Sequence, residues 1–160
     1  MKANKLFGSL DELVLVLPAT GTVVTTGAFD VPHVGHRRYL RKAREFGNVL
    51  VVILQSDDLI KRRKGESRPI NSELTRAKRM SGKAYKYVNY VFIAKSYEEL
   101  NKAIQKIHPE ALVVSETTED IETCPKTMIE LFGKDMKVIV LPAQSELHSS
   151  DIIKRRKLKK

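Results

Sequence analysis

The sequence predicts an α/β fold in which an open parallel sheet of five strands is covered by helices on both faces. Short runs rich in β-branched residues alternate along the chain with segments of helical periodicity, which is the pattern of strand–helix–strand units. The runs are short and mostly apolar, as expected of strands that are buried on both faces. The predicted strands cover residues 23–26, 49–54, 90–94, 111–115 and 137–142.

Helical patterns fill the intervals between the predicted strands. One of them opens with the capping box Ser96-x-x-Glu99, and another starts at Pro125 and ends at Gly133, the usual placement of these two residue types. A third places a single apolar stripe at Tyr39, Leu40, Ala43 and Phe46. The predicted helices cover residues 35–46, about 72–85, 97–107 and 125–132, and a last one follows Ser149.

The chain is predicted to form one domain over residues 1–160, with an N-terminal extension at 1–20 and a basic tail at 154–160. The extension contains the capping box Ser9-x-x-Glu12, which predicts a short helix. A hydrophobic content of 42% and a charged content of 30% are ordinary for a globular protein. No internal repeat or low-complexity linker indicates a second domain.

Targeting and redox features favour a cytoplasmic protein. No apolar run approaches the roughly 20 residues needed to cross a bilayer, and the N-terminus lacks the cleavage site of a signal peptide. The one cysteine, Cys124, has no partner for an internal disulfide, and no metal-type cysteine spacing is present. A reducing compartment and a protein without a membrane span are therefore expected.

The net charge of +10 favours anionic partners, which leaves nucleotides, nucleic acids and membrane surfaces open. Lysine and arginine cluster at residues 59–65 and in the tail at 154–160, and such clusters are most often a solvated face. Aromatic residues make up only 6% of the chain, and no aromatic-rich RNA-binding strand is present. A basic RNA-binding module is therefore the disfavoured alternative.

The stretch TTGAFDVPHVGH at residues 25–36 follows the first predicted strand. In open α/β sheets the ligand lies beyond the carboxyl ends of the strands, so this loop belongs to the predicted site. Gly27 allows the backbone to approach a ligand, and a helix that begins near Gly35 offers N–H groups to phosphate. His33 and His36 at this junction suit hydrogen bonding to phosphate oxygens. Zinc binding, for which no third ligand lies nearby in the sequence, and simple packing stay open as alternatives.

Three motifs resemble those of the cytidylyltransferase-like nucleotidyltransferases. GAFDVPHVGH (27–36) is similar to their G-x-F-D-x-x-H-x-G-H signature, and KGESRPIN (64–71) is similar to a K-G-x-x-R-P-I-N segment. LHSSDIIKR (147–155) is similar to their C-terminal Ser/Thr-rich motif, which opens the last helix and holds the triphosphate. The resemblance implies a Rossmann-like fold and the transfer of a nucleotidyl group from an NTP to a phosphorylated acceptor, with release of pyrophosphate.

Within this family the chain resembles the adenylyltransferase domain of ADP-heptose synthase, through KLFGSLDEL (5–13) and REFGNVLVVILQSDDLIKRRKG (44–65). This implies transfer of AMP to a sugar phosphate such as heptose 1-phosphate. SETTED (115–120) instead resembles a loop of phosphopantetheine adenylyltransferases, and SELHSSDII (145–153) resembles the choline- and ethanolamine-phosphate cytidylyltransferases. The alternatives are therefore AMP transfer to phosphopantetheine, or CTP-dependent transfer to glycerol 3-phosphate, phosphocholine or phosphoethanolamine.

The resemblance assigns roles to individual residues. The implied catalytic residues, which stabilise charge on the phosphates, are His33, His36 and Lys64. The implied nucleotide-binding residues are Thr26, Gly27, Ala28, Phe29, Gly35, Arg68, Ser149 and Ser150. The implied acceptor-binding residues are Asp30, Asp57 and Glu116, although Asp30 also suits a loop-holding role and Asp57 a helix cap. No protein ligand for a metal is expected, and Mg²⁺ is expected with the triphosphate.

The expected partners are thus an NTP, either ATP or CTP, and a phosphorylated small molecule. Relatives in this family commonly form dimers, so a homodimer is compatible with the resemblance. A protein that senses nucleotides without catalysing a reaction is disfavoured, because both histidines and both flanking motifs are intact.

Overall fold

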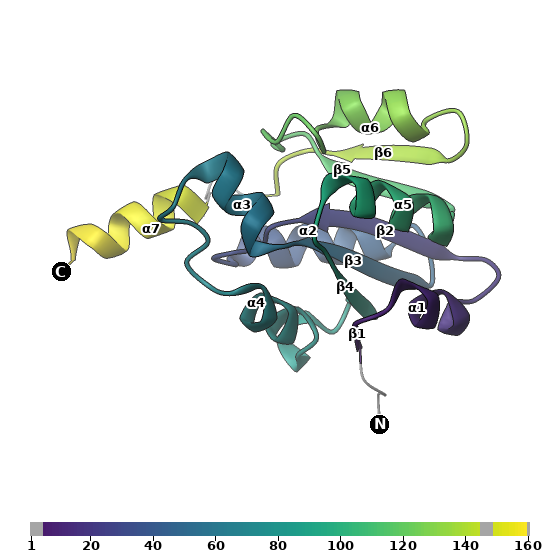
Figure 1. Ribbon diagram of the computed structural model, residues 1–160, viewed down its shortest axis with the longest axis horizontal. Coiled ribbons are helices and arrows are strands. Elements are labelled where there is room, and N and C mark those ends of the chain that lie inside the picture. Colours follow the sequence, from purple (N-terminus) through teal and green to yellow (C-terminus); the bar gives the residue numbers. More distant parts are fainter. Residues whose placement is uncertain (1–4, 145–148, 160) are drawn as a thin grey trace.

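The structure is a computed structural model that describes residues 5–144 and 149–159. Parallel strands form one six-stranded sheet in the order β1-β4-β3-β2-β5-β6 (Figure 1). The predicted parallel α/β sheet is confirmed, with one strand more than expected. The strands are β1 (Leu6–Phe7), β2 (Thr22–Gly27), β3 (Val49–Gln55), β4 (Tyr90–Ala94), β5 (Ala111–Ser115) and β6 (Lys137–Leu141).

The additional strand, β1, lies in the N-terminal extension. Its two residues pair with Val91 and Phe92 of β4, and Lys5 just before it donates a hydrogen bond from Nζ to the Val88 carbonyl at 2.8 Å. Two residues are too few to carry a hydrophobic period, so the sequence predicts no strand here. The pairing covers an edge of β4 that would otherwise expose unpaired backbone groups.

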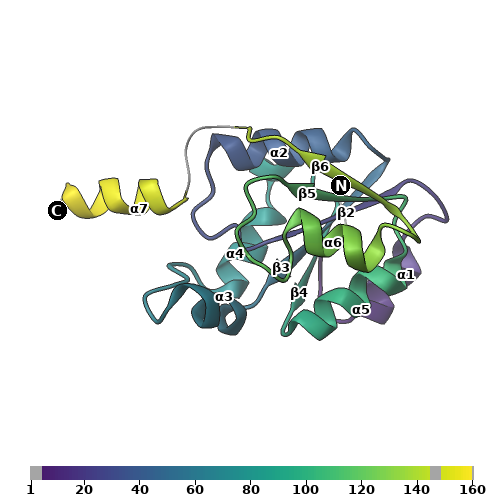
Figure 2. The ribbon, with the colours of Figure 1, turned by 90° about the horizontal axis from the view of Figure 1, so that it is seen from above.

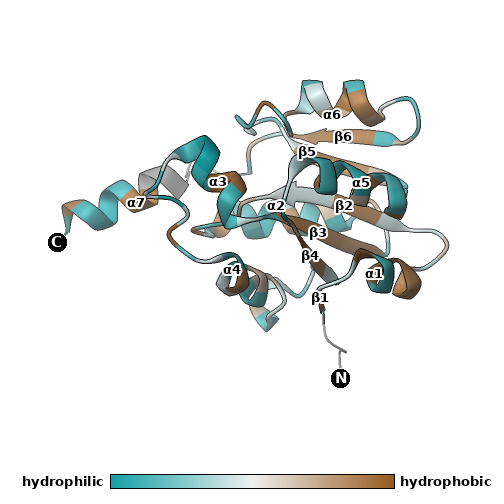
Figure 3. Ribbon diagram, in the orientation of Figure 1, coloured by the Kyte–Doolittle hydropathy of each residue, from teal (hydrophilic) through white to brown (hydrophobic). Residues whose placement is uncertain are grey.

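Helices cover both faces of the sheet (Figure 2). The helices α2 (Val34–Arg44) and α4 (Glu73–Met80) bury their apolar stripes against one face. The other face is covered by α1 (Leu10–Val16), α5 (Tyr97–Ile107) and α6 (Pro125–Phe132). The strands therefore lie between two helical layers, and this explains why they are mostly hydrophobic (Figure 3).

Three further helices complete the described part of the chain. They are α3 (Asp57–Lys64), the 3₁₀ helix η1 (Lys83–Tyr85) and α7 (Ser149–Leu158). Helix α7 projects away from the sheet and is mostly hydrophilic (Figures 1 and 3). Over residues 5–144 and 149–159, no helix is both long and apolar enough to cross a membrane.

The predicted helix at 35–46 is shorter than expected at its C-terminus. It ends at Arg44, and Phe46, which was predicted on the buried stripe, is 40% exposed. The chain turns at Gly47, where an added Cβ would lie 2.4 Å from the Gly21 carbonyl oxygen. The helix has already ended at Arg44, and the turn that leads into β3 carries Phe46 off the stripe.

Two other expectations about helices are corrected. The predicted helix at about 72–85 is divided into α4 and η1, because the chain leaves the helical conformation at Gly82, whose ψ is 174°. The expected cap of α3 by Asp57 is also wrong. Ser56 is the N-cap, and its Oγ accepts a hydrogen bond from the Leu59 N–H at 3.4 Å. Asp57 lies in the first turn instead.

Candidate active site

The loop that follows β2 forms the floor of the candidate site. Phe29 has a left-handed backbone with φ of 47°, and its ring folds back over Gly27. A Cβ at Gly27 would lie 2.7 Å from Cε2 of that ring, so only glycine fits beneath it. The buried ring also contacts His36 edge to face, with 5.2 Å between the ring centroids. Packing in this loop thus fixes where α2 begins.

Both histidines are oriented by backbone hydrogen bonds at the N-terminus of α2. The Nδ1 atom of His33 accepts a hydrogen bond from the Gly35 N–H at 3.0 Å. The Nδ1 atom of His36 accepts one from the His33 N–H at 3.2 Å. An imidazole that accepts at Nδ1 carries its proton on Nε2 when neutral, so each ring presents an N–H donor there. The two rings lie 4.0 Å apart between centroids.

Asp30 connects this loop to the segment that follows α3. The carboxylate, which is 1% exposed, accepts hydrogen bonds from the backbone N–H groups of Ile70 and Asn71, each at 2.8 Å, and from Arg68 Nε at 3.0 Å. Burial acts to raise the pKa of Asp30, but these bonds and the Arg68 charge outweigh it and hold the pKa below its ordinary value. Asp30 therefore holds the loop.

A second clamp is formed by Arg76 of α4, whose side chain is 0% exposed. Its Nη1 donates to the carbonyl oxygens of Ala28 at 2.9 Å and Gln55 at 2.7 Å, and its Nε donates to that of Asn71 at 3.0 Å. Its Nη2 forms an ion pair with Asp57 at 2.8 Å. One buried guanidinium thus joins the ends of β2 and β3 to the start of α3.

Lys64 is the last residue of α3 and lies in the wall of the same cavity. Its side chain remains accessible to solvent, but the surrounding wall withdraws part of its hydration. This desolvation, together with the charges of Arg63 and Arg68, lowers the pKa of Lys64 to about 8, while Asp30 and Glu119 oppose the shift. A fraction of the Lys64 side chains is therefore uncharged near pH 8 in the unliganded protein.

These elements surround one open cavity of about 890 Å³ at the carboxyl ends of β2, β3 and β5. Most predicted site residues line it: Thr26, Gly27, Ala28, Phe29, Asp30, His33, Gly35, His36, Lys64 and Arg68. The Nη2 atom of Arg68 is buried and has no hydrogen-bond partner among the described residues. A buried donor of this kind favours a ligand that accepts from it.

Two predicted acceptor-binding residues are not among those that line the cavity. Asp57 forms the ion pair with Arg76, and the Glu116 carboxylate accepts a hydrogen bond from the Ala143 N–H at 2.8 Å. Ser149 and Ser150 open α7, but their side chains lie outside the described part of the structure. Other α7 residues do reach the cavity: Ile153, Lys154 and Lys157.

A polar group in the cavity wall was not predicted from the sequence; it consists of Gln55, Arg63, Asp120 and Thr123. Nothing local distinguishes these residues. Arg63 stands in a run of basic residues, and Gln55 and Asp120 are separated by 65 positions. Over residues 5–144 and 149–159, no group of three His, Cys, Asp or Glu side chains is placed to hold a metal ion.

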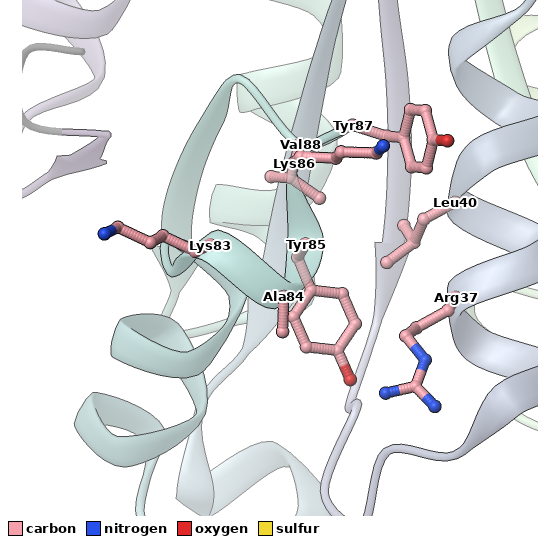
Figure 4. Close-up of a pocket in the computed structure, with 8 residues that line it drawn as sticks. All are labelled: Arg37, Leu40, Lys83, Ala84, Tyr85, Lys86, Tyr87 and Val88. Carbon is pink, nitrogen blue, oxygen red and sulfur yellow. The ribbon is translucent and has the colours of Figure 1, made fainter. Parts of the chain in front are cut away.

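A second cavity, of about 220 Å³, lies between α2 and η1 (Figure 4). Three basic residues line it, but their charged groups do not converge. Lys83 extends away from the cavity, and Lys86 Nζ lies 5.2 Å from the centroid of the Tyr87 ring (Figure 4). Arg37 faces the hydroxyl end of Tyr85 (Figure 4). This arrangement offers no anion cradle comparable to the first cavity.

Comparison with known proteins agrees with the fold and the motifs. Residues 24–156 match the cytidylyltransferase-like family, and the chain belongs to that family. A bifunctional protein HldE from Campylobacter curvus (strain 525.92) is 39% identical over 82% of the chain. A bifunctional protein HldE from Campylobacter jejuni subsp. jejuni serotype O:6 is 36% identical over 98% of the chain. The sequence-based resemblance is therefore confirmed, and the chain is a nucleotidyltransferase-like domain.

The chain spans 27% and 32% of the lengths of these two curated relatives. Among solved structures, the lipopolysaccharide core biosynthesis protein from Thermoplasma volcanium matches with a TM-score of 0.62 and 22% identity, covering 81% of this chain and 100% of that one. Pantothenate synthetase from Thermus thermophilus matches with a TM-score of 0.65 and 16% identity, covering 98% and 70%. These two structural similarities concern the fold alone.

Proposed function

We propose that this protein transfers a nucleotidyl group, AMP from ATP by preference, to a phosphorylated small-molecule acceptor and releases pyrophosphate. The observation that carries the proposal is the convergence of His33, His36 and Lys64 on one cavity at the carboxyl ends of the strands. The unpartnered Nη2 of Arg68 and the α7 lysines add donors for an anionic ligand. Together these groups suit a triphosphate and an acceptor phosphate.

The reaction requires no nucleophile from the protein. An acceptor phosphate oxygen attacks the α-phosphorus in line, and pyrophosphate leaves from the opposite side. His33 and His36 donate from Nε2 to phosphate oxygens as negative charge builds up in the transition state. The Lys64 ammonium group neutralises negative charge on the acceptor phosphate or on the α-phosphate. Because both imidazoles are held by backbone N–H groups, their donors are preorganised before the substrates bind.

We expect Mg²⁺ to enter with the triphosphate, held by phosphate oxygens and water. Two of the acidic side chains that line the cavity are already engaged, because Asp30 accepts three hydrogen bonds through its carboxylate and Asp120 accepts from several donors. Glu119 is the remaining acidic residue of the described lining, so we expect the protein chiefly to bind and orient the phosphates.

The acceptor we favour is a sugar phosphate such as heptose 1-phosphate. The resemblance to ADP-heptose synthase and the similarity to bifunctional HldE proteins support it. The cavity lining also argues against phosphocholine. Its aromatic residues other than histidine, within the described residues, are Phe29 and Tyr39, and both are buried. No aromatic cage is therefore offered to a quaternary ammonium group.

Pyrophosphate release tests the proposal. ATP, CTP, GTP and UTP with Mg²⁺ are to be combined with heptose 1-phosphate, glycerol 3-phosphate, phosphocholine, phosphoethanolamine and phosphopantetheine. We expect release with ATP and heptose 1-phosphate, and none when the acceptor is omitted. Release with CTP and glycerol 3-phosphate would instead establish the cytidylyltransferase alternative. Absence of release with every pair would contradict the proposed function.

A pH profile tests the role of Lys64. Because its pKa is lowered to about 8, the ammonium charge is present below that pH and is lost above it. We expect kcat/KM for the NTP, which reports on the free protein, to fall as the pH rises through about 8. The fall in kcat should come at higher pH, because bound phosphates favour the charged form.

Arginine keeps its charge over this whole range, so Lys64→Arg should remove the alkaline fall in kcat/KM, even if its turnover is lower. Lys61→Arg, an exposed residue of the same helix, provides the matched control and should leave the profile as in the wild type. An alkaline fall that persists unchanged in Lys64→Arg would show that another group titrates.

A further inference from the structure

A buried polar network stands behind one wall of the cavity. Its centre is Asp120, which is 3% exposed and lies in the segment after β5. The Oδ2 atom of its carboxylate accepts hydrogen bonds from Gln55 Nε2 and the Tyr97 hydroxyl, both at 2.9 Å, and from the Thr123 hydroxyl at 3.2 Å. Oδ1 accepts from the Glu122 N–H at 3.2 Å. These bonds fix the carboxylate in one position.

The network holds Arg63 at the cavity surface. Arg63 Nε lies 3.6 Å from Asp120 Oδ2, and Nη2 donates to Gln55 Oε1 at 3.1 Å. The side chain of Arg63 is 25% exposed and lines the cavity. A guanidinium has five N–H donors; one is used by Gln55, the buried Nε faces Asp120, and Tyr97 also bonds this side chain, which leaves donors on the Nη groups. Arg63 therefore keeps further donors for a ligand while its position is set from behind.

The charge of Arg63 is balanced, because its guanidinium pairs with the buried carboxylate of Asp120. By contrast, the cavity-lining lysines of α7 form no ion pair with the described residues. A triphosphate is attracted to unpaired positive charge, whereas a neutralised guanidinium suits uncharged oxygen acceptors such as hydroxyl groups. The Arg63 guanidinium itself is thus suited to a neutral, hydroxylated group.

We propose that Arg63 recognises the acceptor by donating hydrogen bonds to the hydroxyl oxygens of an uncharged polyol, and that Asp120 positions it. This inference rests on the proposed nucleotidyl transfer and specifies the class of acceptor. An ammonium head group would be repelled by the Arg63 guanidinium. The only lining carboxylate on this wall that is not engaged, within the described residues, is the exposed Glu119. Polyol phosphates are therefore favoured over phosphoethanolamine.

The test compares Arg63→Gln with the wild type, using heptose 1-phosphate, glycerol 3-phosphate and phosphoethanolamine as acceptors. For the polyol phosphate that the wild type uses, kcat/KM should fall about 10- to 100-fold, as expected for the loss of hydrogen bonds from a charged donor. KM for the NTP should stay close to the wild-type value. The preference for phosphoethanolamine over the polyol phosphate should rise, because the Asp120 charge is no longer matched.

A loss of structure would lower kcat/KM for both acceptors and would not change their ratio. The ratio of kcat/KM for phosphoethanolamine to that for the polyol phosphate therefore separates recognition from folding. In the double variant Arg63→Gln, Asp120→Asn the unmatched carboxylate charge is gone. Its relative kcat/KM for phosphoethanolamine should therefore return to that of the wild type. Arg63→Lys keeps the charge but lacks the planar fork, and we expect an intermediate loss with the polyol phosphate. Arg62→Gln, a neighbouring exposed arginine that does not line the cavity, is the matched control.

The possible failures are distinguishable. If the wild type releases pyrophosphate but Arg63→Gln keeps the wild-type kcat/KM for every acceptor, the role of Arg63 is wrong and the proposed function stands. An equal loss for polyol and ammonium acceptors would likewise overturn the recognition role. Absence of release from the wild type with all acceptors would overturn the proposed function and this inference with it.

Discussion

Replacing His36 with alanine is expected to lower kcat by about 10²- to 10³-fold, the usual cost of removing one preorganised donor to a developing charge. His36 lines the cavity at the start of α2, and its Nδ1 is occupied by the His33 N–H. The substitution removes the Nε2 donor without disturbing the buried stripe of the helix. Pyrophosphate release and a thermal unfolding curve, measured on the same preparation, check both parts of this expectation.

Two further variants sharpen this measurement. His36→Gln places an amide N–H near the position of the imidazole Nε2, so we expect it to retain more activity than His36→Ala. His108→Asn removes a histidine that does not line the cavity, at a left-handed position with φ of 47° that asparagine tolerates. That variant should keep full activity. A folded His36→Ala protein with wild-type turnover would contradict the assignment of the site.

Replacing Arg76 with methionine is expected to have the largest effect on stability. It would leave three carbonyl oxygens and the Asp57 carboxylate without their donor, in the fully buried position that Arg76 occupies. Each buried carbonyl oxygen left without a donor costs about 1–3 kcal/mol, whereas Asp57 is 29% exposed and can be hydrated, so we expect a total loss of about 3–5 kcal/mol. For a chain of this size the melting temperature should fall on the order of 10 °C.

Denaturant unfolding of Arg76→Met against Arg79→Met is the appropriate comparison. Arg79 lies in the same helix but is exposed, so its replacement should change the free energy of unfolding by no more than about 0.5 kcal/mol. Because Arg76 binds the carbonyls of Ala28 and Gln55, the KM for the NTP should also rise in Arg76→Met. If the free energy of unfolding of Arg76→Met fell by less than about 1 kcal/mol, the proposed clamping role of Arg76 would be contradicted.

The two clamps explain how a site made of loops stays in one arrangement. Asp30 binds the backbone of residues 70 and 71, and Arg76 binds the backbone at the ends of β2 and β3. Both use charged side chains on backbone groups, and such bonds are stronger than neutral ones. The loop carrying His33 and the segment carrying Lys64 therefore keep a fixed relation before any substrate binds.

Local sequence is enough to predict the alternation of strands and helices, the parallel sheet and the loop with its two histidines. These features follow from the local spacing of residues. The signals are apolar runs bounded by turns, serine caps at Ser9 and Ser96, and a glycine directly after the first predicted strand. Each depends on residues that are neighbours along the chain, so a short window contains the whole signal.

Which charged residues belong to the site is set by tertiary contacts. Residues 61–64 are four consecutive basic residues, and nothing local shows that Arg63 and Lys64 line the cavity while Arg62 does not. Arg63 is held at the cavity by its ion pair with Asp120, which lies in the segment after β5. Likewise, Asp57 looks like a cap or a substrate ligand until the buried Arg76 is seen to bind it. Arg63 follows β3 and Asp120 follows β5, and these two strands lie on either side of β2, so the pair depends on the strand order, which a linear pattern does not contain.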